Sequence, residues 1–149
     1  MPREALLLSI RPKFASQILD GSKTVELRRV RPHVRTGQRV LIYGSFPTMA
    51  LLGVAEVQDV LTSRPAKMWS KVGRLAGVTR EEFTEYFRGA RRAVAIRLRC
   101  VRAFSRPVGL SSLRERWPWF RPPQSYCYVR MSVENSRPRL RSLAPRRGQ

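Results

Sequence analysis

Residues 7–29 read LLSIRPKFASQILDGSKTVELRR, and this stretch predicts a strand, a helix and a second strand in close succession. The apolar run over residues 4–10 is typical of a short buried strand. Pro12 stands where a helix can begin, because the first helical position does not need a backbone N–H. Gly21 is placed to end that helix, so the chain passes directly into the second strand.

The second strand carries ionisable residues in a definite order within GSKTVELRRVRP, residues 21–32. Successive side chains of a strand point to opposite faces, so Glu26 and Arg28 fall together on one face while apolar residues occupy the other. Lys23 stands just ahead of them. From the pattern alone, this arrangement fits either a binding site or an exposed ion pair. An exposed ion pair would contribute about 0–1 kcal/mol to the stability of the fold.

The whole chain predicts an α+β fold, a small mixed and closed β-barrel with flanking helices. Six strands are expected, with one helix after the first strand and others before the fifth. These helical connections are too many crossovers for a β-sandwich. Beyond the first two strands, the expected elements are strands at 39–45, 49–61 (with Gly53 as a bulge or bend), 92–104 and 125–131, and helical segments within 65–88 and 111–117.

Length and charge indicate one basic domain. The chain has 149 residues, of which 42% are hydrophobic, and 30 Lys and Arg stand against 10 Asp and Glu, a net charge of +20. We expect one domain over residues 1–131 and a basic, flexible tail over residues 132–149, where five Arg and one Glu contribute +4. Most of the charge therefore belongs to the folded part, and such a charge attracts polyanions, so nucleic acid is the expected partner.

Several protein classes are not expected from the sequence. The first apolar run is too short for a signal peptide, and no stretch approaches the roughly 20 apolar residues of a membrane span. Cys100 and Cys127 lie in strand-like runs, which suggests buried, reduced thiols and a cytoplasmic protein. One His and two Cys form no metal-site spacing, and no glycine-rich phosphate loop is present. We therefore expect no metal, no cofactor and no membrane association.

Four segments match one known family: the opening stretch at 7–29, VLIYGSFP at 40–47, LLGVAEV at 51–57 and FRPPQSYCYV at 120–129. Together they resemble the ASCH domain, a branch of the PUA-like superfamily. The resemblance covers roughly residues 5–131 and implies a pseudo-barrel with a cleft beside its helices, in which relatives hold RNA or a nucleotide. Some small bacterial relatives hydrolyse 4-acetylcytidine, some have been described as ribonucleases, and others occur as coactivator-associated modules.

With this resemblance, Lys23, Glu26 and Arg28 are predicted to line the cleft. Lys23 can supply a point charge for phosphate, Glu26 can accept from a base edge, and Arg28 can pair with Glu26 or fork onto a phosphate. Tyr43 could line the cleft or simply pack the barrel, and the loop at 117–126 could stack a base or cover the barrel end. The further residues predicted to contact ligand are Ser9, Arg11, Tyr43, Ser45, Gln124 and Ser125.

We expect this domain to bind RNA, another nucleic acid or a nucleotide, and two alternatives remain. The first is an RNA- or nucleoside-processing enzyme, a ribonuclease or an acetylcytidine amidohydrolase, with Lys23 and Glu26 as candidate catalytic residues. The hydrolase pattern has a lysine, a threonine three residues later and a glutamate in the helical segment, whereas this chain has Glu26 in place of the threonine and offers only Glu81, Glu82 and Glu85 later. The second alternative is a basic accessory protein of a ribonucleoprotein.

Overall fold

Strands and short helices alternate along the chain in a mixed α+β arrangement. The computed structural model describes residues 3–131 and 145–146. In chain order the elements are β1 (Arg3–Ile10), α1 (Pro12–Asp20), β2 (Val25–Arg28), β3 (Arg39–Gly44), β4 (Ala50–Ser63), α2 (Pro65–Val72), the 3-10 helix η1 (Gly73–Leu75), α3 (Arg80–Tyr86), β5 (Ala93–Gly109), α4 (Leu110–Arg116), β6 (Tyr126–Met131) and β7 (Pro145–Arg146).

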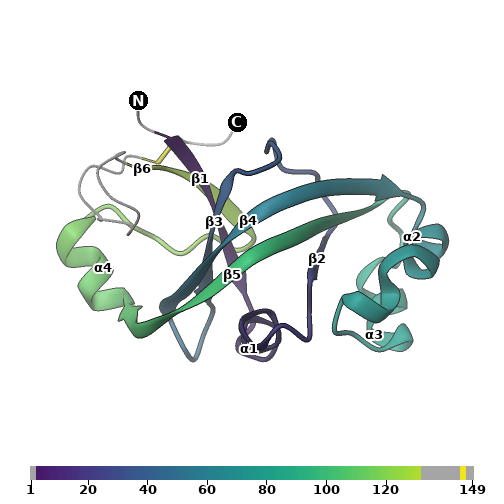
Figure 1. Ribbon diagram of the computed structural model, residues 1–149, viewed down its shortest axis with the longest axis horizontal. Coiled ribbons are helices and arrows are strands. Elements are labelled where there is room, and N and C mark those ends of the chain that lie inside the picture. The colour runs from purple at the N-terminus through teal and green to yellow at the C-terminus, as the bar shows by residue number, and fades with distance from the viewer. Residues whose placement is uncertain (1–2, 132–144, 147–149) are drawn as a thin grey trace.

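One sheet joins all the described strands in the order β2-β5-β4-β3-β1-β6-β7. The β1 and β3 strands are parallel and every other pair is antiparallel. Because a parallel pair needs a crossover connection, α1 and β2 lie between β1 and β3 in the sequence. Figure 1 shows the long strands β4 and β5 crossing the molecule, with α4 at one end and α2 and α3 at the other.

The predicted α+β class is confirmed, whereas the predicted closed barrel is not, because the sheet is open. Strand β2 is only four residues long, stands at one edge of the strand order and is paired with β5. Within the described residues, no backbone ladder joins β2 to β1 or β6. The side chain of Arg28 crosses this gap instead, and it contacts β1 and the residue before β6.

Alternating side chains of β1 divide the interior into two apolar clusters, and the helical end adds a third. Leu7 packs with Tyr43, Trp117 and Phe120 below α4. Its neighbours Leu6 and Leu8 pack on the opposite face, against α1 and the middle of the long strands. The third cluster joins one face of β2 to α2 and α3, so β2 is covered by the helical end on that side.

The helical segment predicted over residues 65–88 is confirmed as α2, η1 and α3. Thr79 and Glu82 form the expected capping box at the start of α3. The backbone N–H of Glu82 donates to Thr79 Oγ1 at 3.1 Å, and the backbone N–H of Thr79 donates to Glu82 Oε1 at 3.2 Å. Both helix-terminal N–H groups thereby gain acceptors, which fixes where α3 begins.

Irregularities in β4 and β5 explain one success and one error of the sequence predictions. The pairing shifts between Leu51 and Gly53, as expected for a bulge at Gly53, where a Cβ atom would lie 2.5 Å from the Arg102 carbonyl oxygen. A second shift places Cys100 and its neighbour opposite a single residue of β4. Cys100 there has φ +53° and is exposed, so the expected burial of this thiol is wrong.

The predicted tail over residues 132–149 lies outside the described residues, apart from the two residues of β7 beside β6. Among the described helices, none is both long and apolar enough to cross a membrane.

Candidate functional site

Three ionisable residues of the β2 segment are nearly inaccessible to solvent. The exposed fractions are 2% for Lys23, 7% for Glu26 and 8% for Arg28. Val25 and Leu27 alternate with them and pack into the cluster with α2 and α3, so both faces of this short strand are buried. The interpretation of Glu26 and Arg28 as an ordinary exposed ion pair therefore does not hold.

Lys23 lies where α1, β2 and the segment after η1 meet. Its Nζ donates a hydrogen bond to the Ala76 carbonyl oxygen, lies 3.8 Å from Glu26 Oε2 and sits 5.1 Å from the centre of the Phe14 ring. Burial lowers the pKa of Lys23 from its ordinary value of 10.5, and the neighbouring Glu26 carboxylate partly opposes that effect. A lysine of this kind releases a proton more readily than a solvated lysine does.

Glu26 stands between the two cations. Its Oε1 lies 3.6 Å from Arg28 Nη2, while its buried Oε2 has no hydrogen-bond donor within the described residues. Both ion-pair distances exceed hydrogen-bond length, so charge holds the carboxylate in place while Oε2 keeps free acceptor capacity. A buried acceptor without a donor costs free energy, and a ligand N–H or O–H can recover part of it.

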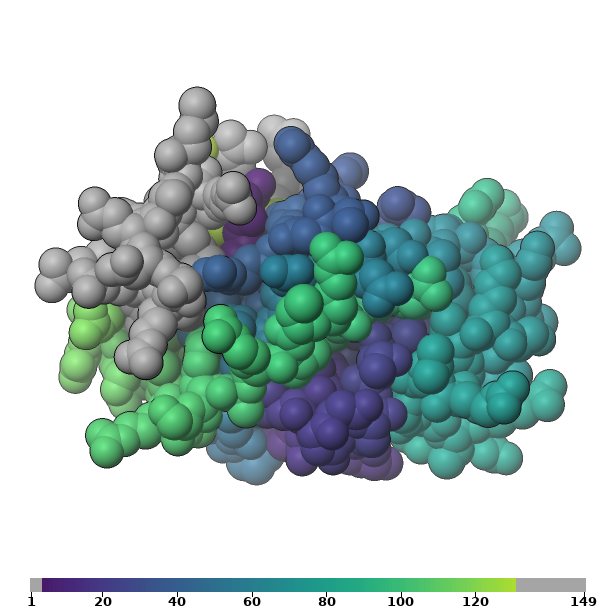
Figure 2. Space-filling view, in the orientation of Figure 1, coloured from purple at the N-terminus to yellow at the C-terminus, as the bar shows by residue number. Residues whose placement is uncertain are grey.

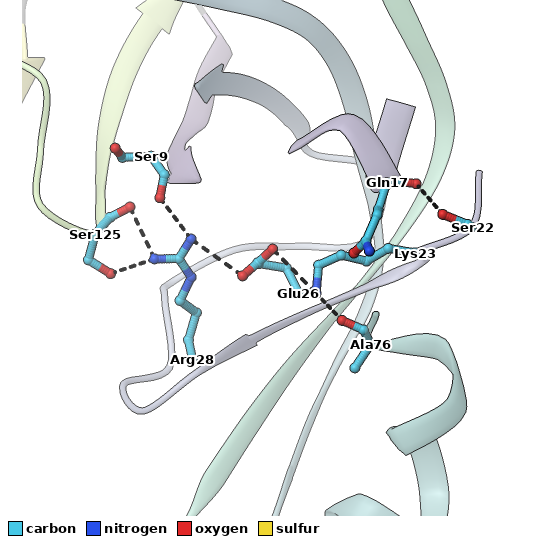
Figure 3. A network of polar contacts seen from close by, with 8 residues as sticks. All are labelled: Ser9, Gln17, Ser22, Lys23, Glu26, Arg28, Ala76 and Ser125. Atoms are coloured by element: carbon cyan, nitrogen blue, oxygen red, sulfur yellow. Dashed lines mark hydrogen bonds and ion pairs between the residues drawn. The ribbon is translucent and has the colours of Figure 1, made fainter. Parts of the chain in front are cut away.

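Arg28 connects this strand to the far side of the sheet. Its Nη1 donates to Ser125 Oγ at 3.0 Å and to the Ser125 carbonyl oxygen at 3.3 Å, and its Nη2 donates to the Ser9 carbonyl oxygen at 3.1 Å. The Ser9 N–H also donates to the Ser125 carbonyl oxygen at 2.9 Å. Figure 3 shows the continuous path from Ser125 through Arg28 and Glu26 to Lys23 and Ala76. We use the name β2 network for Ser9, Lys23, Glu26, Arg28, Ala76 and Ser125.

The β2 network reaches the surface at its Ser125 end. Ser125 is exposed, and so is Gln124 beside it. Ser9 is half-buried and contributes its backbone carbonyl to the network. The structure thus brings together five of the nine residues that the sequence predicted as ligand contacts: Ser9, Lys23, Glu26, Arg28 and Ser125.

Arg11 and Ser45 directly follow β1 and β3, and neither has a side-chain contact with the β2 network among the described residues. Arg11 is exposed, two residues after Ser9, and caps the start of α1 without a side-chain hydrogen bond. Ser45 follows β3, and its N–H donates to the Ile10 carbonyl oxygen at 2.8 Å. Both residues are positioned through their backbones at the ends of β1 and β3.

Tyr43 packs in the core, with 1% of its surface exposed. It stands opposite Ser9 in the β1–β3 register, and its ring meets the edge of Phe120 at a centroid distance of 6.0 Å. Its buried hydroxyl has no hydrogen-bond partner among the described residues. Burial raises the pKa of Tyr43, against an opposing effect of the nearby Arg114 charge.

The aromatic loop after α4 mainly covers the apolar cluster under it. Phe120 is 1% exposed and packs on Tyr43, so its ring is not available to a base. Trp119 is 39% exposed and stacks on Trp117 at 5.7 Å. Of Trp119 and Phe120, only Trp119 therefore presents accessible surface on which a base could stack.

Sequence reasoning missed the backbone contribution to the network. The carbonyl oxygens of Ala76, Ser9 and Ser125 accept hydrogen bonds from Lys23 and Arg28. Every residue carries such a carbonyl, so no residue type signals this role. The Phe14 ring was predictable as part of the apolar face of α1, but its position over Lys23 was not.

Two of the three acidic residues of α3, Glu82 and Glu85, have partners other than Lys23. The carboxylate of Glu82 closes the capping box and lies 3.9 Å from Lys13 Nζ, and Glu85 accepts from Arg88 at 2.7 Å. These contacts do not support the lysine, threonine and glutamate arrangement of the acetylcytidine hydrolases. In the described part of the chain, no group of three or more His, Cys, Asp or Glu is placed to hold a metal ion.

Comparisons with known proteins agree with this fold. The family model described as domain of unknown function DUF365 matches residues 4–113. An ASCH domain-containing ribonuclease of Zymomonas mobilis is 34% identical over 128 residues, which are 86% of this chain and 86% of that protein. The crystal structure of ASCH from Zymomonas mobilis has a TM-score of 0.78 and covers 82% of this chain and 85% of its own. The crystal structure of a serine-to-alanine mutant of the Zymomonas mobilis protein has a TM-score of 0.79 and is 33% identical in sequence. The match covers 85% of this chain and 89% of the mutant chain.

Proposed function

This chain belongs to the ASCH domain family, and from that premise we propose that it binds single-stranded RNA at the β2 network and cleaves it. The observation that carries the proposal is the buried pair of Lys23 and Glu26, an amine with a lowered pKa 3.8 Å from a carboxylate with an unfilled acceptor. The similarity to a ribonuclease over 86% of the chain supports RNA as the substrate class.

The charge of the chain supports a polyanionic substrate. A net charge of +20 draws RNA to the surface through its phosphates, and this attraction does not depend on sequence. The exposed end of the network at Ser125 is where a ligand reaches Arg28, whose guanidinium can fork onto a phosphate. The small exposed fractions of Glu26 and Arg28 mean that bound RNA would be largely desolvated there.

The chemistry that suits this pair is cleavage by the neighbouring 2′-hydroxyl of RNA. Glu26 accepts the 2′-hydroxyl proton as the 2′-oxygen bonds to phosphorus, and Arg28 stabilises the charge on the phosphate oxygens. Protonated Lys23 donates its proton to the leaving 5′-oxygen as the P–O5′ bond breaks. The lowered pKa of Lys23 makes it a better proton donor than an ordinary lysine. The products are a 2′,3′-cyclic phosphate and a free 5′-hydroxyl.

Cleavage of a labelled single-stranded oligonucleotide tests this proposal. Loss of one proton-transfer group costs typically 10²- to 10⁴-fold, so we expect Lys23→Met and Glu26→Gln each to lose about 100-fold or more in rate. Lys67→Met removes an exposed lysine of α2 and serves as the matched control, with a rate within about twofold of wild type. A 2′-deoxy substitution at the cleaved nucleotide should block the reaction. Full activity of both network variants would overturn the assignment.

Binding without turnover is the second candidate, and the free acceptor of Glu26 between two cations favours it as well. Such a pocket can read a base edge through Glu26 while Lys23 and Arg28 face phosphate. The same variants distinguish the cases. A preference for particular nucleotides that falls in Glu26→Gln, while wild type shows no cleavage, indicates a binding module. An affinity that no network variant changes indicates a basic accessory protein.

A further inference from the structure

A groove of about 1010 Å³ lies between α2, η1 and α3, apart from the β2 network. Figure 1 places these helices together at one end of the molecule, and Figure 2 shows them as a teal lobe beside the purple N-terminal segment. The volume is at the upper end of the range for small-molecule sites, about 300–1,000 Å³, so it exceeds what one nucleotide needs.

Aromatic rings form the floor of this groove. Trp69 and Phe83 lie 5.1 Å apart between ring centres, and Phe83 and Phe87 lie 4.7 Å apart. Trp69 lies directly against the backbone of Gly73, where a Cβ atom would come within 2.7 Å of the indole ring. Trp69 is only partly buried, so part of its indole surface remains available to a ligand.

Positive charge surrounds the aromatic floor. Lys71, Arg74 and Arg80 line the groove, are exposed, and make no ion pair within the described residues. Arg88 also lines it and is paired with Glu85. None of the lining residues is acidic. Three such cations in the same groove as these rings match a ligand that carries both phosphates and flat bases.

The groove is joined to the β2 network through one short segment. The Thr24 N–H donates to the Leu75 carbonyl oxygen at 3.0 Å, and Lys23 donates to the next carbonyl, that of Ala76. Leu75 and Arg74 line the groove themselves. The groove therefore adjoins the Lys23 and Ala76 end of the β2 network, whose exposed end is at Ser125.

We propose that the α2–α3 groove binds unpaired nucleotides of the same single-stranded RNA, on one side of the nucleotide held at the β2 network. This inference rests on the proposed function for its RNA ligand. Bases stack on the exposed surface of Trp69, and phosphates face Lys71, Arg74 and Arg80. The groove thereby selects unpaired over double-stranded RNA, because paired bases cannot reach an aromatic floor.

Affinity measured against oligonucleotide length tests the groove. The probes are fluorescein-labelled oligouridylates of 4 and 12 nucleotides, with fluorescence anisotropy as the readout. We expect Arg74→Ala with Arg80→Ala to weaken binding of the 12-mer about 10-fold or more. The matched control, Arg102→Ala with Arg106→Ala, removes the same charge from exposed positions of β5 and should weaken it less than about threefold. The 4-mer should lose a similar, small factor in both double variants.

Tryptophan emission gives a second readout that does not depend on charge. The 12-mer should quench the emission of the wild-type protein, and Trp69→Phe should lose most of that quenching while the affinity stays within about threefold. The Trp119→Phe variant should retain the quenching. Quenching that persists in Trp69→Phe would place the bases elsewhere.

The experiments can disprove either proposal without disproving the other. Equal loss of 12-mer affinity in the groove pair and the β5 pair overturns the groove as an RNA site, whatever happens to cleavage. If Lys23→Met abolishes cleavage in the same experiment, the proposed function stands without the groove. If instead the groove pair weakens binding while Lys23→Met and Glu26→Gln cleave normally, the groove stands and the catalytic assignment fails.

Discussion

Arg28 and Ser125 lie 97 positions apart in the sequence, yet Nη1 of Arg28 donates to the hydroxyl of Ser125 at 3.0 Å. This contact, with the one from Arg28 to the Ser9 carbonyl, spans the gap between the β2 edge and the β1–β6 pair. A buried guanidinium thus connects parts of the open sheet that no backbone ladder joins within residues 3–131 and 145–146. Arg28 also belongs to the proposed RNA site, so we assign it both a structural and a functional role.

Removal of the Arg28 side chain should destabilise the fold. Among the described residues, Arg28→Ala leaves Glu26 paired with Lys23 alone in a nearly dry site. We expect a loss of about 1–3 kcal/mol in the free energy of unfolding. Ser125→Ala should cost less, because the Ser125 carbonyl still accepts from Arg28. Urea unfolding measures both, with exposed Arg102→Ala as a control within about 0.5 kcal/mol. If Arg28→Ala had the same free energy of unfolding as that control, the contacts of Arg28 with Ser9, Glu26 and Ser125 would contribute nothing to stability.

Neutralising Glu26 should separate specific from bulk binding. Glu26→Gln keeps the size of the side chain and removes its charge, so the fold should stand while the preference for particular nucleotides falls. Affinity for bulk RNA should stay level or rise slightly, because one negative charge is lost. A competition titration between a preferred nucleotide and mixed-sequence RNA measures the difference. An unchanged preference would exclude Glu26 as the acceptor that reads the base.

Lys23 predicts a specific dependence of stability on pH. Its folded pKa is lowered mainly by burial, so between that value and 10.5 the unfolded chain binds more protons than the folded one. The Lys23 contribution to the free energy of unfolding therefore rises as pH increases through this window and levels off above 10.5. We expect wild type to gain stability relative to Lys23→Met as pH approaches 10.5. Denaturant melts of both proteins at stepped pH values test this, and a constant difference would contradict it.

The two cysteines should react at very different rates. Cys100 is exposed, whereas Cys127 is half-buried and burial raises its pKa to about 11. The thiolate is the nucleophile, so at pH 8 iodoacetamide should modify Cys100 first and leave Cys127 largely intact in the native protein. Peptide mapping by mass spectrometry locates the label, and Cys100→Ser should remove the fast phase. Prompt labelling at Cys127 would contradict its burial.

Binding of RNA should weaken steeply with salt. Phosphate contacts release counterions, so the logarithm of the binding constant should fall linearly with the logarithm of the salt concentration. Deletion of residues 132–149 removes a charge of +4 and should flatten that slope. Titrations between about 50 and 200 mM salt measure it for both chains. An affinity that does not change with salt would argue against RNA as the partner.

Local patterns in the sequence were enough for most elements of the fold. The alternation in β1, the capping box of Thr79 with Glu82 and the irregularity at Gly53 depend on residues close together in the chain. The placement of Lys23, Glu26 and Arg28 on one segment was equally visible, since strand periodicity acts over two residues. Charge and apolar content are sums over the chain, so the sequence by itself also determined the expected kind of partner.

Tertiary structure alone decided how these pieces meet. Burial of both faces of β2, the Ala76 carbonyl at Lys23 and the reach of Arg28 to Ser125 depend on contacts between distant segments. Backbone acceptors carry no residue signature, and the bulge that exposes Cys100 arises from an unequal pairing of two long strands. The same holds for the groove between α2 and α3, because two helices create its space and neither does so alone. Local periodicity cannot encode such contacts, since their energies depend on which surfaces the completed fold brings together.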